Sequence, residues 1–144
     1  MLLTCGEDLK PARKKYSKHV KAIFQIGDKQ TDDYKTVLGY PIEFIPLSNP
    51  YTLKIGDELA MKLLINRKPI SGEMVYASFN DQYVHEKDGT SRDAYKVLTN
   101  NKGIVTVKIT TAGHWYFRTV NLLKSTEIDA DYISNSASLT FEVK

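Results

Sequence analysis

Turn-forming residues interrupt the chain at short intervals from residue 39 onward, and this spacing constrains the fold more than any other feature. Glycine, proline, asparagine and aspartate mark the turns, at positions 39, 48–50, 56–57, 66–69, 72, 88–89, 100–103 and 113. The stretches between them are rich in β-branched and aromatic residues, and none has a convincing apolar period of 3.6 residues. Frequent turns between short strands are typical of β-sandwiches and barrels.

The runs between these turns predict seven strands, at residues 42–47, 58–65, 74–79, 95–99, 104–109, 115–122 and 139–143. Alternation assigns an inward face to each strand, because successive side chains point to opposite sides. The inward set includes Leu63, Val107, Trp115 and Phe141, whereas Ser78 should point outward with its neighbour Tyr76. We predict an all-β fold, an immunoglobulin-like or transthyretin-like (prealbumin-like) sandwich of about seven strands with an extended N-terminal segment.

Two positions predict details of the strand order. Pro46 cannot donate a hydrogen bond to a neighbouring strand, so the strand at 42–47 should be an edge strand or carry a bulge. Gly103 follows Lys102 at a position that favours positive φ, which predicts a hairpin-type reversal there.

Residues 1–38 differ from the rest of the chain. Lysine and arginine dominate positions 10–35, whereas the acids there are Asp28, Asp32 and Asp33. Val20, Ala22, Phe24 and Ile26 alternate with other residues, which predicts a strand over 20–26 with one apolar face that must find an edge to pair with. We interpret residues 1–38 as a lead-in, the tail of an upstream domain that precedes Met1, and residues 39–144 as the sandwich domain.

Composition sets limits on function. The 144 residues carry 20 lysines and arginines against 17 aspartates and glutamates, a net charge of +3 that is too small for a dedicated nucleic-acid binder. The single Cys5 excludes an internal disulfide framework. No apolar run approaches the roughly 18 residues of a membrane helix, so we expect no direct membrane span.

Three segments resemble a transthyretin-like, carboxypeptidase-regulatory-like module used as an accessory or adhesive domain. They are residues 66–75 (NRKPISGEMV), 99–107 (TNNKGIVTV) and 112–117 (AGHWYF). This resemblance implies the fold and says nothing about an activity.

A second resemblance is to an uncharacterised, mostly periplasmic domain-of-unknown-function family that is linked by name to nickel and cobalt uptake loci. It is carried by residues 39–50 (GYPIEFIPLSNP), 56–59 (GDEL), 113–120 (GHWYFRTV) and 131–142 (DYISNSASLTFE). The resemblance implies a periplasmic or secreted location, an upstream domain of the same parent protein, and a divalent transition metal, nickel or cobalt. The family often has a histidine, an acid and a tryptophan where this chain has Asn121, Ile133 and Ser136.

A candidate binding face follows from alternation in the strand predicted at 115–122. His114, Tyr116 and Arg118 share one side of it, and Tyr76 is expected nearby on a neighbouring strand. Arginine offers a planar fork of donors, tyrosine a stacking surface and histidine a switchable donor, a set suited to an anion or a sugar. The alternative is an ordinary cross-strand ladder of polar side chains.

Metal and catalytic chemistry have weaker signals. His85 with Glu86 and Asp88, or His85 pooled with His114, is the candidate metal site, since imidazole and carboxylate suit zinc or nickel; the alternative for residues 83–89 is a polar loop. The acids at 127, 129 and 131 lack the glycine of a calcium loop. No nucleophile elbow, Walker loop or dinucleotide fingerprint is present, so we predict that the chain is not an enzyme.

The function predicted from these features is a non-catalytic binding or accessory domain of an exported protein, connected with transition-metal uptake. The alternative is a carbohydrate- or anion-binding module that uses Tyr76, His114, Tyr116 and Arg118. The expected partners are the upstream domain and an envelope protein or glycan.

Overall fold

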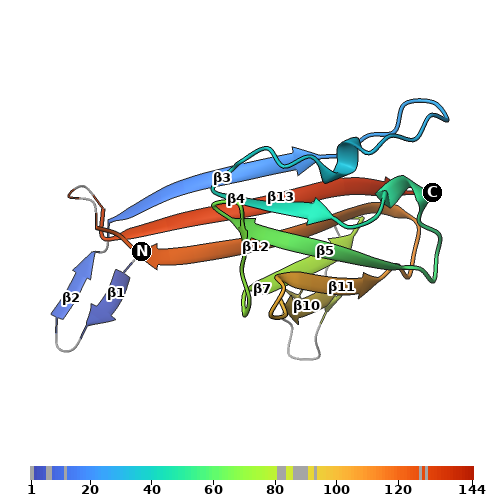
Figure 1. Ribbon diagram of the computed structural model, residues 1–144. Coiled ribbons are helices and arrows are strands. Elements are labelled where there is room, and N and C mark those ends of the chain that lie inside the picture. Colours follow the sequence, from blue (N-terminus) through green and yellow to red (C-terminus); the bar gives the residue numbers. More distant parts are fainter. Residues whose placement is uncertain are drawn as a thin grey trace.

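The computed structural model describes residues 2–5, 8–11, 13–80, 84–85, 91–92, 94–126, 128 and 130–144. For residues 2–5, 8–11, 84–85 and 91–92 it describes the backbone alone, and for the others it also describes the side chains. Within this part of the chain the fold is an all-β sandwich of two main sheets (Figure 1). It agrees with the immunoglobulin-like or transthyretin-like sandwich predicted above. Short 3-10 turns, η1 (Asp33–Lys35) and η2 (Pro50–Thr52), lie between strands.

The first sheet has five strands in the spatial order β10–β7–β12–β13–β3. Its members are β3 (Lys14–Ala22), β7 (Met74–Phe79), β10 (Tyr95–Leu98), β12 (Gly113–Lys124) and β13 (Tyr132–Val143). All neighbours are antiparallel except β13 and β3, which run parallel. Figure 1 shows β3, β12 and β13 continuing past the ends of the other sheet.

The second sheet has four strands, with β11–β5–β4 in order and β6 paired to the end of β5. Its members are β4 (Ile42–Pro46), β5 (Glu58–Ile65), β6 (Lys68–Pro69) and β11 (Ile104–Lys108). Two further pairs are β1 (Leu2–Cys5) with β2 (Asp8–Pro11), and β8 (Val84–His85) with β9 (Ser91–Arg92). In the described part of the chain, no helix has the length and apolar character needed to cross a membrane.

The core lies between the two main sheets. Leu63 and Val107 from one sheet meet Trp115 and Phe141 from the other, and all four are buried as predicted. The Phe117 ring lies between its aromatic neighbours, with centroids 6.1 Å from Phe44 and 6.2 Å from Phe141. Each large apolar side chain buried here contributes roughly 1.5–3 kcal/mol, so this layer accounts for the stability of the sandwich.

All seven predicted strands are present, and β4 is an edge strand as Pro46 requires. The reversal at Gly103 is also confirmed, with φ at 75°. It is not a hairpin, because β10 and β11 belong to different sheets and the turn carries the chain from one layer to the other. Ser78 has the predicted parity with Tyr76 but is buried, so the outer face is covered at that point.

The N-terminal strand differs from the prediction. It spans Lys14–Ala22 and finds its edge on β13, in parallel register. The apolar face expected for residues 20–26 points to solvent, with Val20 57%, Phe24 80% and Ile26 90% exposed. The alternation was assigned to the wrong face because Ile23, which lies between these residues, is the one that packs against the core. The domain boundary at residue 38 stays a prediction.

Candidate ligand-binding groove

A groove of about 390 Å³ opens on the outer face of the five-stranded sheet, the face turned away from the core. It lies over β13 and between β3 and β12. Its lining consists of Tyr16, Lys18, Tyr116, Arg118, Thr119, Val120, Ser136, Ala137, Ser138 and Thr140. The volume is within the usual range for small-molecule sites, which is roughly 300–1,000 Å³.

The strand register explains why a hollow forms here. Residues paired across neighbouring strands share a face, so Lys18, Ser136 and Val120 make one row across the sheet. Two residues further along β13, Ser138 is paired with Arg118, and Thr140 with Tyr116. The floor therefore consists of short hydroxyl side chains on β13, and larger side chains from β3 and β12 rise on either side.

Interactions near both ends of β3 hold this register. At its start, the Arg13 backbone N–H donates to Asp131 Oδ2 at 2.8 Å. This bond, together with a second hydrogen bond from the Arg13 side chain, lowers the pKa of the Asp131 carboxyl. Near its end, Lys21 Nζ lies 2.9 Å from Glu43 Oε2 on β4. Burial raises the pKa of Glu43, but hydrogen bonds from Lys21 and from the Leu38 and Gly39 amides outweigh it and leave that pKa lowered. Tyr16 and Lys18 lie between these two anchors.

Two serine hydroxyls of β13 have no hydrogen-bond partner, and one of them belongs to a residue at the floor of the groove. Ser134 Oγ and Ser136 Oγ are shielded from solvent and make no hydrogen bond, and Ser136 as a residue is 7% exposed. Leaving a buried polar group unpaired destabilises a fold by about 1–3 kcal/mol. Ser136 lies at the floor of the groove, but its Oγ is shielded, so the floor residues open to a ligand are Ser138 and Thr140.

The charged side chains at the groove are cations. The Arg118 guanidinium lies over the Tyr76 ring, with Cζ 4.5 Å from its centroid. On the opposite wall, Lys14 Nζ lies 5.6 Å from the centroid of the Tyr16 ring. The described lining residues include Lys18 and Arg118 and no carboxylate. The groove therefore combines positive charge, two phenol rings and a line of hydroxyls.

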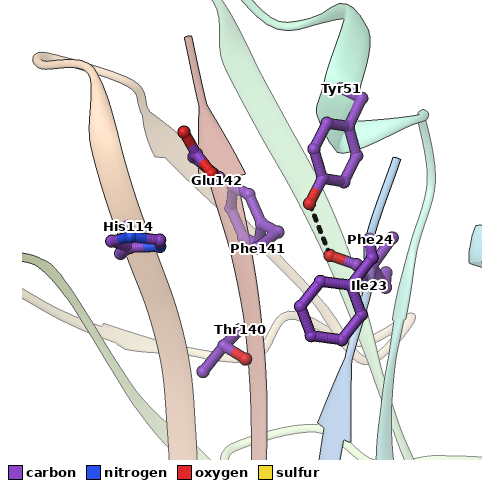
Figure 2. A pocket seen from close by; sticks show the side chains of 7 residues that line it. All are labelled: Ile23, Phe24, Tyr51, His114, Thr140, Phe141 and Glu142. Atoms are coloured by element: carbon purple, nitrogen blue, oxygen red, sulfur yellow. Dashed lines mark hydrogen bonds between the residues drawn. The ribbon is translucent and has the colours of Figure 1, made fainter. Parts of the chain in front are cut away.

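The four residues predicted for this face are only partly brought together. Tyr116 and Arg118 line the groove, and Tyr76 supports Arg118 from the neighbouring strand. His114 lies outside it, in an adjacent hollow of about 70 Å³. Figure 2 shows His114 and Glu142 on neighbouring strands at one side of that hollow, with Phe24 and Tyr51 on the other side. The Tyr51 hydroxyl donates to the Ile23 carbonyl at 2.6 Å.

The metal prediction has little support from the described residues. The side chain of His85 lies outside them. His114 and Glu142 are paired across strands and offer two donors, and no group of three histidine, cysteine or acidic side chains occurs in the described part. Structural zinc sites use four protein ligands and catalytic ones three, so this pair does not form a coordination shell. The link to nickel and cobalt stays a prediction from resemblance.

Of the residues that line the groove, sequence reasoning predicted Tyr116 and Arg118 as binding residues. Tyr16 and Lys18 were assigned to the lead-in, and Ser136 and Ser138 lie before the strand predicted at 139–143, which includes Thr140. The signal that could have found the floor is its period of two, since hydroxyls stand at every second position from 134 to 140. That spacing places them on one face of a strand.

The fold and groove together define a β-sandwich domain with a recessed groove on the outer face of one sheet. Comparison with protein families gives a match to the family described as "Domain of unknown function (DUF4198)" over residues 6–122. This match covers most of the chain, so the chain belongs to that family, which agrees with the predicted resemblance to an uncharacterised domain family. Searches of curated proteins and of solved structures gave no match.

Proposed function

We propose that this chain is a non-catalytic carbohydrate-binding domain of an exported protein, and that the groove over β13 is its binding site. One observation carries the proposal: the hydroxyl residues Ser138 and Thr140 lie at the floor of a groove walled by tyrosines and cations. Export is proposed from the family resemblance alone.

The chemistry of the lining suits a sugar. Serine and threonine hydroxyls both donate and accept hydrogen bonds, as sugar hydroxyls do, so Ser138 and Thr140 on the floor can pair with either polarity. The phenol rings of Tyr16 and Tyr116 offer apolar surface with a polar tip. Arg118, supported by Tyr76, presents a fork of donors that matches two neighbouring oxygens.

The Ser138→Ala variant tests the proposal, because Ser138 is a half-buried hydroxyl residue at the floor of the groove. Removing this hydroxyl should change the free energy of unfolding by no more than about 1 kcal/mol. Affinity for a sugar identified on a glycan array should fall about five- to tenfold, the loss of one hydrogen bond worth roughly 1 kcal/mol. Ser71→Ala, at an exposed position before β7, is the matched control and should change neither quantity.

Two outcomes would contradict the proposal. One is a glycan array on which the wild-type protein binds nothing. The other is a bound glycan whose affinity is unaffected by Ser138→Ala and by Arg118→Ala. Calorimetric titration with nickel, cobalt and zinc on the same samples, with His85→Ala and His114→Ala variants, addresses the metal prediction. Metal binding that depends on either histidine, in a protein that binds no glycan, would assign the function to metal handling instead.

A further inference from the structure

Resting on the carbohydrate-binding role proposed above, we propose that the natural ligand is an acidic polysaccharide, bound along a line of cations that crosses the whole outer face of the five-stranded sheet. The ligand class is a linear chain with a carboxylate or other anionic group on its sugar units. The groove holds one part of this chain, and cations outside the groove hold the rest.

The register places the cations on one face. Lys14 on β3 and Lys124 on β12 are both paired with Tyr132, so they lie in one row at the far end of the sheet. Lys18 is two rows further along, on the wall of the groove. Arg118 is in the next row, where it is paired with Tyr76, and Tyr76 is paired in turn with Lys96 on β10. We call the five cations of this face the basic track: Lys14, Lys18, Lys96, Arg118 and Lys124.

The four lysines of the basic track are exposed. Among the described residues of the five strands, the acid on this face is Glu142, which is paired with His114 toward the other end of β12 and β13. Charge on this face is therefore unbalanced, although the chain as a whole has a net charge of only +3. An excess of one sign on one face raises the local concentration of the opposite sign.

The dimensions of the basic track require a polymer. From Lys124 to Arg118 the track advances six residues along β12, which is about 20 Å at roughly 3.3 Å per residue. From β3 to β10 it crosses four strand spacings of about 4.8 Å, again close to 20 Å. A single sugar in the groove cannot reach both ends, so the outer lysines act only on a chain of several units.

The lining favours a polysaccharide over a nucleic acid. Non-specific binding of single strands uses a series of aromatic platforms on which successive bases stack. Here the floor is a row of hydroxyls, and the aromatic rings of the groove, Tyr16 and Tyr116, stand on opposite walls. Hydroxyls pair with sugar oxygens and offer no stacking surface to a base.

Calorimetry with oligogalacturonates of increasing length tests the inference on the intact chain. Affinity should increase with chain length until the track is covered, and it should fall as salt is raised, because exposed charges are screened. The double variant Lys14→Gln/Lys124→Gln should weaken binding of a long oligomer about five- to tenfold and leave binding of a disaccharide unchanged. Lys108→Gln, exposed on β11 of the other sheet, is the control and should have no effect.

The outcomes separate the two proposals. Equal affinity for oligogalacturonate and for its neutral methyl ester, unaffected by the double variant, would overturn the acidic ligand and leave the carbohydrate groove standing. Absence of binding to charged and neutral glycans alike would overturn both. Binding of single-stranded DNA of matched charge, or of vesicles rich in anionic lipid, as tight as that of the oligogalacturonate would overturn the polysaccharide assignment.

Discussion

The ion pair between Lys21 and Glu43 gives the sharpest stability prediction, because it joins β3 of one sheet to β4 of the other in a nearly dry environment. The Lys21 Nζ to Glu43 Oε2 distance is 2.9 Å, and the side chains are 10% and 1% exposed. Nζ also donates to the Phe44 carbonyl at 3.0 Å. Glu43 accepts two further bonds, from the backbone N–H groups of Leu38 and Gly39.

We predict that Lys21→Met destabilises the fold by roughly 3–5 kcal/mol at neutral pH, the usual effect of removing one partner from a buried pair. Methionine keeps the packing of the lysine stem, so the loss reports the charge that Glu43 then lacks. The value should lie near the lower limit, because the carboxylate retains the Leu38 and Gly39 donors. Replacing both members, as Lys21→Met/Glu43→Gln, should recover part of the loss.

The pH dependence has a defined sign. The pKa of Glu43 is lowered in the folded state from its ordinary 4.5, so its stabilising effect is present above that value and is lost as pH falls below it. In Lys21→Met the folded-state pKa rises relative to wild type, since the burial remains and the lysine is gone. The difference in unfolding free energy between the two proteins should therefore shrink as pH is lowered from 7 toward 3.

Urea denaturation followed by the fluorescence of Trp115, the single tryptophan, measures these quantities. Lys35→Met is the matched control, because Lys35 pairs with Asp32 at 3.6 Å with both side chains more than half exposed. That variant should change stability by no more than about 1 kcal/mol. A loss below about 1 kcal/mol in Lys21→Met, or a difference that grows toward low pH, would refute the reasoning.

Three further variants test the packing and the groove. Gly103→Ala should destabilise the fold by roughly 1–3 kcal/mol, since φ is +75° and a new Cβ would lie 2.9 Å from Pro69 Cβ. Gly72→Ala has the same φ but open space around the new Cβ, so it reports the backbone strain alone. Equal losses of stability in urea for the two variants would contradict the predicted clash with Pro69. Trp115→Phe should lower the free energy of unfolding by about 1–3 kcal/mol, because it leaves a void and removes the 2.9 Å hydrogen bond from Nε1 to the Thr111 carbonyl. Denaturation followed by circular dichroism measures this loss, and an unchanged stability would contradict the packing of Trp115. Arg118→Lys keeps the charge but loses the planar fork, so sugar affinity should fall severalfold in calorimetry, and an unchanged value would exclude Arg118 from the site.

Alternation in the sequence was sufficient to predict the sandwich core. Strands with one apolar and one polar face, such as the one carrying Val105 and Val107, were placed correctly because burial follows a period of two. Edge placement of β4 followed from the missing N–H of Pro46. These features depend on local chemistry that a single sequence displays.

The parts that sequence reasoning missed depend on pairing between distant segments. β13 begins at Tyr132, seven residues before the predicted strand, because its first half is serine-rich and gains its strand conformation from β12 and β3. The face of β3 was assigned wrongly because the hydrophobic pattern pointed to Val20 and Phe24, whereas parallel pairing and the buried partner of Lys21 set the register. The groove lies where these two segments meet, so most of its lining residues were not predicted as site residues.

The central claim is that a carbohydrate binds on the outer face of the five-stranded sheet, over β13. Backbone amide chemical-shift mapping of the isotope-labelled protein, titrated with an oligogalacturonate, tests it most directly. The account predicts shift changes that cluster at Lys18, Arg118, Ser136 and Ser138 and spread toward Lys14 and Lys124 with longer oligomers. Changes confined to the four-stranded sheet, or no saturable changes anywhere, would contradict it.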